Sequence, residues 1–386
     1  MPERKIKVYH LIPSFWTQHG PSNCIMAQIR SHDPGQFEFS IWSLYAPPPA
    51  LDPRDLLSKA HLGYRVFPMG PSFLDLRVLW PLVRELRREP PDILHCHLLR
   101  ANLYGRVAAR FAGIRKVINT IHGVDEYMSA GDLISRSLRL VERLSAAWVS
   151  QYVAVSENAR NAVIRNLKLA PKKVSTILNA LELAPFQSSR ADAAAIRREL
   201  EVAPEALVVG AVGRLAPLKN FASLVNWFAG IKSDCPRAQL VIIGDGEDRG
   251  VLEDLIARRR LRDTVKLAGF RTDIPRILAA LDIFAFPSVS EGLSIALLEA
   301  MAAGLPCVVM DVGGNSEAVV PGETGYIIPL SKGAEFKAAL LRLLEDGQLR
   351  KKMGTAGKNR AFTLFNPQRL AAQYEELYRT LLNQRP

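Results

Sequence analysis

The chain has 386 residues, of which 48% are hydrophobic and 23% charged, and its formal net charge is +12. A chain of this length is too long for one ordinary hydrophobic core, so it predicts two domains. The composition is typical of a globular protein, and no apolar run is long enough to span a bilayer. The first residues, MPERKIKVYHLIPSFW, indicate a buried strand rather than a signal peptide, because no small-residue cleavage site follows the short apolar stretch.

The cysteines and the charges limit the compartment and the partners. No two of the four cysteines have CxxC spacing, which indicates a cytoplasmic protein with reduced thiols and no zinc site. Residues 1–180 hold 24 Lys and Arg against 14 Asp and Glu, whereas residues 181–386 hold 26 against 24. This asymmetry favours an anionic partner, a membrane surface before nucleic acid, because no nucleic-acid motif is present. The alternative is a basic face that serves only solubility.

Strand-like and helical patterns alternate in chain order. In the first half, short β-branched and apolar runs predict strands at 5–12, 92–98, 116–122, 151–156 and 173–178, and amphipathic runs predict helices at 73–89 and 101–113. In the second half, strands are predicted at 206–215, 238–246, 264–270, 282–288, 306–314 and 325–330, and helices at 223–232, 249–260, 294–304 and 365–384. This alternation predicts an α/β fold whose parallel sheets are covered on both faces.

A polar, irregular segment at 179–195 separates the two halves and is the expected hinge. No short-period repeat is present, which argues against a solenoid. Two doubly wound domains are therefore expected, with ligands at the carboxyl ends of the strands, in the cleft between the domains.

The segment EGLSIALLE, residues 291–299, places two glutamates eight positions apart. If a helix opens after Gly292, Glu291 and Glu299 lie roughly 12 Å apart along its axis. Carboxylates that flank one glycosidic bond lie about 5–9.5 Å apart, so these two would contact different parts of a longer ligand.

The amides of Gly292, Leu293 and Ser294 would lie at the start of that helix, where anions such as phosphate are favoured. A nucleotide-sugar, with a diphosphate between hydroxyl-bearing ends, fits this arrangement. The alternative is a helix with two ordinary glutamates, and the spacing by itself favours that alternative.

The surrounding segments resemble a known family, the retaining, metal-independent GT-B glycosyltransferases of family 4. FPSVSEGLSIALLEAMAAGLPCVVMDVGGNSEAVVPGETGYII (286–328) is similar to the E-x7-E element of this family, and VGRLAPLKNFASLVNWF (212–228) resembles its donor-phosphate segment. In the first half, PDILHCHLLRANLYGRVAARFAGIRKVINTIHG (91–123) and QYVAVSENAR (151–160) resemble its acceptor domain.

The resemblance implies GT-B architecture, with two Rossmann-like domains that face a central cleft. Residues 1–183 would form the acceptor-binding domain, 184–366 the donor-binding domain, and a last helix at about 367–386 would cross back to the first domain. The implied reaction moves a sugar from a UDP- or GDP-linked donor to a glycan or lipid-linked acceptor, with no cofactor and no metal. Synthesis of surface polysaccharide, lipopolysaccharide or glycolipid is the implied role.

The residue roles implied by the resemblance concentrate in the second half. Arg214 and Lys219 follow a predicted strand and would bind the donor diphosphate, as two cations at a strand end are suited to do. Glu291 would approach the donor sugar. Glu299 would bind the ribose hydroxyls, since a carboxylate accepts two hydrogen bonds at once. Backbone contacts to the base would come from Phe270 and Arg271.

In the first half, His122 occupies the family's HG position near the donor sugar and would contribute to catalysis. His95 and His97 lie on one face of a strand, but no third ligand is evident from the sequence, so we reject a metal site there. Gly20 in the loop HGPSN would approach phosphate, although Pro21 stands where many relatives have a second glycine. Trp80, in the basic amphipathic run 73–89, would suit an anionic membrane surface and a lipid-linked acceptor.

Other functions remain as alternatives. A sugar-nucleotide epimerase of GT-B fold would release nucleotide without an acceptor, and a catalytically dead nucleotide-sugar-binding protein would retain only the binding residues. A phosphorylase would need a pyridoxal phosphate lysine, for which no motif is present. A nicotinamide oxidoreductase is disfavoured because no G-x-G-x-x-G follows the first strand.

Overall fold

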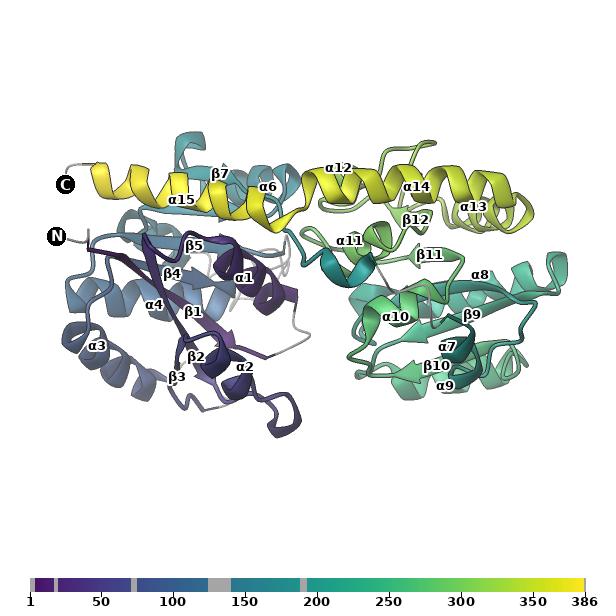
Figure 1. The fold of residues 1–386 in the computed structure, drawn as a ribbon, viewed down its shortest axis with the longest axis horizontal. Helices are drawn as coiled ribbons and strands as arrows, with labels where there is room; N and C mark the ends of the chain where they lie inside the picture. The colour runs from purple at the N-terminus through teal and green to yellow at the C-terminus, as the bar shows by residue number, and fades with distance from the viewer. Residues whose placement is uncertain (1–3, 17–19, 71–74, 124–139, 188–192, 385–386) are drawn as a thin grey trace. The chain divides into compact units, whose positions relative to one another are not determined.

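The computed structural model describes residues 4–16, 20–70, 75–123, 140–187 and 193–384. The chain divides into two compact units, one formed by residues 1–180 with 367–386 and the other by residues 181–366. Each unit contains one parallel sheet whose connections are mostly helices (Figure 1). In the described ranges, no helix has both the length and the apolar character that a bilayer crossing requires.

The first unit is built on a sheet with strand order β3-β2-β1-β4-β5-β6-β7 among the described residues. Its strands are β1 (Ile6–Ser14), β2 (Phe37–Tyr45), β3 (Gly63–Val66), β4 (Ile93–His97), β5 (Val117–Ile121), β6 (Gln151–Ala154) and β7 (Val174–Thr176). Its helices are α1 (Gly20–Ser31), α2 (Arg54–Lys59), α3 (Leu79–Arg88), α4 (Leu98–Ala112), α6 (Glu157–Leu167) and α15 (Pro367–Asn383), with a 3₁₀ turn η2 (Leu76–Val78) before α3.

The last helix belongs to the first unit although it is last in the chain. Leu370, Tyr374 and Tyr378 of α15 are buried in a cluster with strand residues of the first sheet, including Val8 and Ile93. The helix also packs beside α1. Its apolar face, which the sequence shows by its helical period, is therefore buried on this sheet.

The second unit has a sheet with strand order β10-β9-β8-β11-β12-β13 in the described part of the chain. Its strands are β8 (Leu207–Val212), β9 (Ala238–Ile243), β10 (Val265–Gly269), β11 (Ile283–Phe286), β12 (Cys307–Met310) and β13 (Gly325–Ile328). Its helices are α7 (Ala193–Glu199), α8 (Phe221–Asp234), α9 (Arg249–Arg258), α10 (Ile274–Ala279), α11 (Ile295–Ala302), α12 (Asn315–Ala318), α13 (Gly333–Glu345) and α14 (Gly347–Leu364).

The predicted α/β class and parallel sheets are confirmed. The predicted elements omit β2 and β3, which extend one edge of the first sheet, and several helices, among them α1, whose Gly-Pro start is typical of a loop. The supposed helix start directly after Gly292 is not observed. Helix α11 begins at Ile295, because Gly292 and Leu293 form a bend and Ser294 is extended, so a helix directly after Gly292 does not form.

Both sheets reverse their strand order at one place. In the first sheet, β1 pairs with both β2 and β4, and in the second, β8 pairs with both β9 and β11. The connections on either side of such a switch point leave in opposite directions, so a crevice opens beyond the carboxyl ends of the two central strands. Each unit therefore has one expected binding edge.

Candidate functional site

The binding edge of the second unit is formed by loops that are tied to one another. After β8, the Leu215 amide donates to the Asp245 carbonyl at 3.0 Å, which joins this loop to the loop after β9. The Val289 amide, after β11, donates to the Leu218 carbonyl at 2.9 Å. Asn220 Nδ2 donates to the Pro287 carbonyl at 3.2 Å. These bonds fix the two loops that border the switch point.

Gly313 brings the loop after β12 onto the loop that carries Glu291. Its φ is +54°, and a Cβ placed there would lie 2.0 Å from the Glu291 carbonyl oxygen. The next amide, of Gly314, donates to the Gly292 carbonyl at 2.5 Å. Only a residue without a side chain allows this close approach. The backbone of Glu291 and Gly292 is therefore held from both neighbouring loops.

Lys219 and Glu291 form an ion pair across the switch point. Lys219 ends the short turn after β8, and its Nζ donates to Glu291 Oε1 at 2.5 Å. The two side chains are 23% and 11% exposed, so the pair is largely removed from water. Nζ also lies 5.0 Å from the ring centroid of Phe286, the last residue of β11. The predicted phosphate ligand and the predicted sugar ligand are thus direct neighbours.

Arg214 follows β8 directly and remains exposed. Its closest carboxylate is that of Glu247, with Nη1 3.6 Å from Oε1, and the two side chains are 67% and 53% exposed. An exposed pair at this distance contributes little to stability. Arg214 can therefore change partner at small cost when an anion arrives at the end of β8.

Glu299 lies in the second turn of α11 and is partly buried. Its carboxylate makes no hydrogen bond or ion pair with any residue that the structure describes. Burial raises the pKa of Glu299 to about 8. A carboxyl group left without donors in such a position is an acceptor available to a ligand.

The remaining predicted residues of the second unit differ in their exposure. Gly292, Leu293 and Ser294 are buried between Glu291 and α11. Phe270 follows β10 and is 51% exposed. The Arg271 guanidinium is occupied within the unit, since it pairs with Glu199 and bonds Asp273 through two 2.8 Å contacts. Any contact of Arg271 with a ligand base would therefore come from its backbone.

In the first unit, the predicted histidines lie in β4 and directly after β5. His122 follows β5, and its Nε2 lies 3.2 Å from Nδ1 of His97, the last residue of β4. The following residue, Leu98, has a φ of +68°, an uncommon conformation for a residue with a side chain. Gly20 is the first residue of α1, which follows β1. Its predicted approach to a phosphate group stays a prediction.

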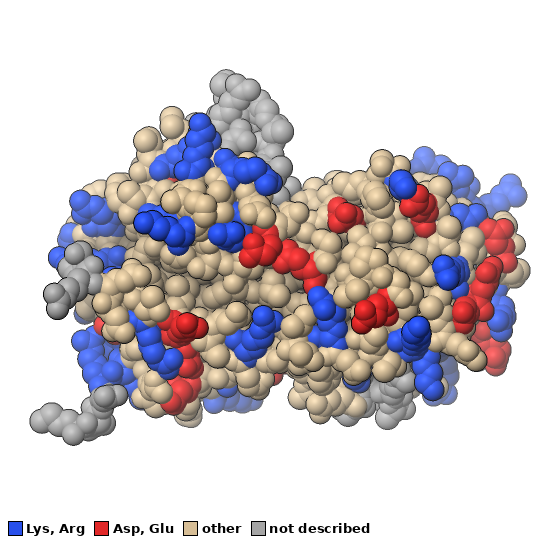
Figure 2. Space-filling view, turned by 90° about the horizontal axis from the view of Figure 1, so that it is seen from above, with Lys and Arg blue, Asp and Glu red and all other residues tan. Residues whose placement is uncertain are grey.

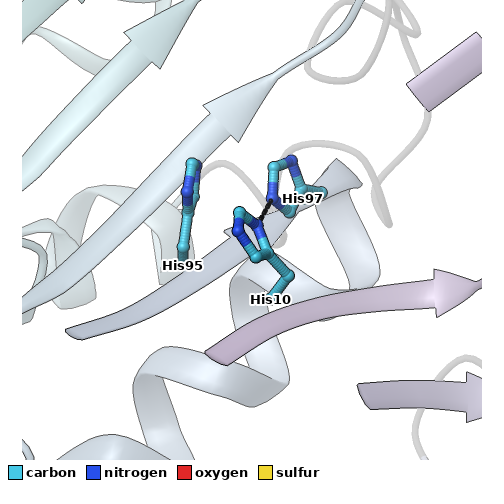
Figure 3. Close-up of side chains that lie close together, drawn as sticks. All are labelled: His10, His95 and His97. Carbon is cyan, nitrogen blue, oxygen red and sulfur yellow. Dashed lines mark hydrogen bonds between the residues drawn. The ribbon is translucent and has the colours of Figure 1, made fainter. Parts of the chain in front are cut away.

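Sequence reasoning missed His10 of β1. It is fully buried, it is adjacent to His95 in the register of β1 and β4, and its Nδ1 lies 2.9 Å from Nε2 of His97 (Figure 3). The missing signal was the parallel pairing of β1 with β4, which a single sequence does not show. Together, His10, His95 and His97 place one ring nitrogen each within 4.8 Å of the others.

This trio does not fit a metal centre well. Both ring nitrogens of His95 have partners, with Nδ1 2.8 Å from the Tyr378 hydroxyl and Nε2 2.7 Å from the Thr120 hydroxyl. The rings of His95 and His97 are stacked with centroids 4.2 Å apart, whereas metal ligands direct in-plane lone pairs at one point. The third ligand that seemed absent from the sequence is present, but the ring geometry favours hydrogen bonding and stacking.

A second surface of the first unit combines apolar and basic side chains. Leu76 of η2, Trp80 of α3 and Phe111 of α4 are 68%, 67% and 61% exposed. Helices α3 and α4 pack side by side, and Arg87 Nη2 donates to the Phe111 carbonyl at 2.9 Å. We call this region, with exposed Arg84, Arg87 and Arg110, the α3–α4 surface. On the face drawn in Figure 2, basic groups are likewise spread over the first unit, with acidic groups among them.

Two family models match the chain and together span both units. Residues 34–184 match the model of glycosyltransferase family 4, and residues 192–360 match that of glycosyl transferases group 1.

Curated relatives align over most of their length. The UDP-Gal:alpha-D-GlcNAc-diphosphoundecaprenol alpha-1,3-galactosyltransferase of Escherichia coli is 30% identical over 309 residues, which are 79% of this chain and 79% of that protein. The N-acetyl-alpha-D-glucosaminyl L-malate synthase of Bacillus anthracis is 26% identical over 321 residues, which are 83% of this chain and 82% of that protein.

Solved structures share the fold. HepE from Anabaena, in complex with UDP, superposes with a TM-score of 0.81 at 23% identity and covers 97% of this chain and 100% of that chain. Sucrose-phosphate synthase from Thermosynechococcus elongatus has a TM-score of 0.80 at 21% identity and covers 98% of this chain and 99% of that chain. At these identities the likeness describes the architecture.

Proposed function

Because this chain belongs to glycosyltransferase family 4, and is thus a glycosyltransferase of the hexosyltransferase type, we propose that it transfers a sugar from a UDP-sugar to a lipid-linked glycan. We further propose that it does so with retention of anomeric configuration and without a metal ion. The observation that supports this most is the Lys219–Glu291 pair at the switch point of the second sheet, followed in the chain by Glu299 of α11, whose carboxylate has no partner among the described residues.

The Lys219–Glu291 ion pair is the basis of our proposal for how the donor diphosphate binds. Lys219 and Glu291 neutralise each other in the free protein at 2.5 Å. A diphosphate that reaches the end of β8 competes for the ammonium group, and Arg214 supplies a second cation there. Once Lys219 turns to phosphate, the Glu291 carboxylate is released to accept hydrogen bonds from sugar hydroxyls. Because these side chains supply the positive charge, the leaving diphosphate is stabilised without a metal.

Glu299 is proposed to bind the ribose of the donor nucleotide. Its carboxylate accepts no hydrogen bond from the residues that the structure describes, and burial raises its pKa to about 8. Two vicinal hydroxyls fit it because one carboxylate accepts from both. The helix that carries Glu299 begins immediately after the loop of Glu291, so one short segment would contact both the ribose and the sugar ring.

Uridine is the proposed base, and a lipid diphosphate-linked glycan is the proposed acceptor. The Escherichia coli relative uses UDP-Gal and a diphosphoundecaprenol-linked acceptor by its name, and the Anabaena structure contains UDP. Both align with most of this chain. Retention is proposed from the family resemblance of the E-x7-E segment.

Peripheral binding to the inner membrane face is proposed for the α3–α4 surface. Trp80 and Leu76 offer apolar side chains, and Arg84, Arg87 and Arg110 offer charges that complement anionic headgroups. Such binding would bring the enzyme to a lipid-linked acceptor. It also gives a role to the excess of positive charge in the first half of the chain.

The test is a binding and turnover experiment with EDTA present. UDP, GDP, ADP and their glucose, galactose and N-acetylglucosamine conjugates are titrated calorimetrically into the protein. A selected UDP-sugar is then incubated with polyprenyl diphosphate-linked N-acetylglucosamine, and the anomeric configuration of the product is read by NMR. An α-linked product from an α-linked donor, formed in EDTA, is expected. Donor loss without acceptor would indicate an epimerase, and absence of turnover despite binding would indicate a dead site.

A further inference from the structure

His10, His97 and His122 form a chain of hydrogen-bonded rings that ends inside the first unit. His10 Nδ1 lies 2.9 Å from His97 Nε2, the contact drawn in Figure 3, and His97 Nδ1 lies 3.2 Å from His122 Nε2. His10 is fully buried and His97 is 2% exposed, whereas His122 is at the partly exposed end. His97 thus uses one nitrogen toward each neighbour.

The two inner rings are neutral. Burial lowers the pKa of His10 to about 3, and burial, followed by the nearby His95 and His10, holds the pKa of His97 well below its usual range. A neutral imidazole has one N–H donor and one acceptor nitrogen. If His97 donates to one neighbour it must accept from the other, so both hydrogen bonds run in the same direction.

The buried end of the chain decides that direction. His10 Nε2 is shielded from solvent and has no hydrogen-bond partner among the described residues. If the bonds ran toward His10, its Nδ1 would accept and its Nε2 would carry an N–H without an acceptor. A buried N–H without a partner is rarer than an unpaired acceptor. The arrangement in which His10 donates to His97 and His97 donates to His122 leaves only an acceptor unpaired.

We propose that His10 and His97 are positioning residues that hold neutral His122 in the tautomer protonated at Nδ1. In this arrangement, Nε2 of His122 is committed to accepting from His97, and any hydrogen bond that the neutral ring donates comes from Nδ1. The proposal rests on the proposed function for its purpose, which is to present a fixed donor near the transferred sugar. A fixed tautomer matters because a histidine in the wrong tautomer offers an acceptor where a donor is needed.

His95 lies next to the hydrogen-bonded series His10–His97–His122 but is not part of it. Its two nitrogens bond the Tyr378 and Thr120 hydroxyls, and it contacts His97 only by ring stacking. His95 therefore provides a matched control, because a substitution there disturbs the same buried region without removing the His10–His97 or the His97–His122 hydrogen bond.

The direct test is NMR of the full chain labelled with ¹⁵N in histidine side chains. Long-range ¹H–¹⁵N spectra distinguish the two tautomers and the imidazolium, and single substitutions assign the rings. We expect His10, His97 and His122 each to carry the proton on Nδ1. His122 protonated on Nε2, or an equal mixture of its tautomers, would overturn the proposal. Stoichiometric Zn²⁺ binding that His10→Phe removes would overturn it as well, since the rings would then be ligands.

Two variants separate the members of the chain. In His97→Phe, His122 loses its donor, and we expect its ring to populate both tautomers. In His10→Phe, Nε2 of His97 becomes the unpaired buried acceptor, so His122 should keep its tautomer while the His97 Nε2 resonance moves toward that of an unbonded nitrogen. His95→Gln should leave His122 unchanged. A reversed His122 tautomer in His10→Phe would contradict the assigned direction.

Turnover separates this proposal from the proposed function. We expect His97→Phe to lower kcat by roughly 10- to 100-fold, as loss of a partner that orients a functional ring does, while the Kd for the UDP-sugar changes less than threefold. His95→Gln should retain most of the activity. If His122 populates both tautomers in His97→Phe and kcat stays normal, His97 does set the tautomer of His122, but His122 has no role in sugar transfer. If kcat falls in a variant whose His122 tautomer is unchanged, the proposal that the tautomer of His122 governs turnover is overturned.

Discussion

Lys219 Nζ and Glu291 Oε1 lie 2.5 Å apart, on loops that follow two adjacent parallel strands, β8 and β11. The cation and the carboxylate that the sequence assigns to different parts of a donor are therefore held together before any donor is bound. A largely buried ion pair gains little net stability, so its persistence at a binding edge is more simply explained by readiness to exchange partners.

Lys219→Ala should weaken binding of a UDP-sugar by roughly 10- to 100-fold, because a charge-assisted hydrogen bond to the diphosphate contributes about 1.5–3 kcal/mol. Calorimetry measures the change. The matched control is Lys266→Ala, which removes a lysine of similar exposure that pairs with Glu201 at 2.8 Å elsewhere in the same unit. Unchanged affinity in Lys219→Ala, or an equal loss in both variants, would remove Lys219 from the donor site.

Gly313→Ala should displace the loop that carries Glu291. Its added Cβ would meet the Glu291 carbonyl oxygen at 2.0 Å, and this contact is with backbone that cannot rotate away. We expect donor affinity to fall by about tenfold or more. Gly322→Ala is the control, because Gly322 also has a positive φ, +75°, but nothing lies within 4 Å of its added Cβ. Comparable losses of affinity would assign the effect to backbone strain alone.

The raised pKa of Glu299 predicts that the affinity for the UDP-sugar depends on pH. Its pKa is raised to about 8 by burial, so below pH 8 the free protein must lose a proton before the carboxylate can accept from the ribose hydroxyls. The Kd of UDP-glucose should therefore fall as pH rises from 6 to 8, by up to about tenfold per unit, and then level. In Glu299→Gln this dependence should vanish, and a 2′,3′-dideoxy nucleotide should be insensitive to the substitution. Equal losses for both nucleotides would argue against a ribose contact.

The same shift has a definite sign for the stability of the free protein. The folded-state pKa lies above the value near 4.5 of the unfolded chain, so the contribution of Glu299 is most favourable below pH 4.5 and is lost as pH rises through 8. Glu299→Gln should remove the part of the decline in the free energy of unfolding with rising pH that comes from this residue. Thermal unfolding of both proteins from pH 5 to 9 measures it, and parallel curves for the two would contradict the assignment.

The sequence was sufficient for what depends on local pattern. The short apolar runs around Val8 and Val209 lie in observed strands, and the second half of EGLSIALLE lies in a helix, α11, as predicted. The contacts between distant segments were not readable. The partnership of Lys219 with Glu291 depends on the pairing of β8 with β11, and that of His10 with His97 depends on the pairing of β1 with β4. A single sequence gives strands but not their order.

The start of α11 shows a second limit. Gly292, Leu293 and Ser294 are compatible with a helix start, yet α11 begins only at Ile295. The structure uses these three residues as a bend, which the neighbouring Gly313 constrains through backbone contacts. Gly313 is distant in sequence from this bend, so the local pattern could not show its effect. For Arg271 the resemblance implies only backbone contacts to the base, and the pairing of its guanidinium with Asp273 and Glu199 leaves that prediction untested.

The α3–α4 surface predicts salt-sensitive binding to anionic vesicles. Insertion of apolar side chains contributes about 1.5–3 kcal/mol for each one fully buried, and arginines add an electrostatic attraction that salt screens. The double variant Leu76→Ser, Trp80→Ser should reduce co-sedimentation with phosphatidylglycerol-containing vesicles by about tenfold or more, and Arg84→Gln with Arg87→Gln should reduce mainly the salt-sensitive part. The control is Val251→Ser with Leu330→Ser, which removes two exposed apolar residues of the second unit. Because all these side chains are exposed, the variants should fold normally, and binding that neither set alters would refute this surface as the membrane contact.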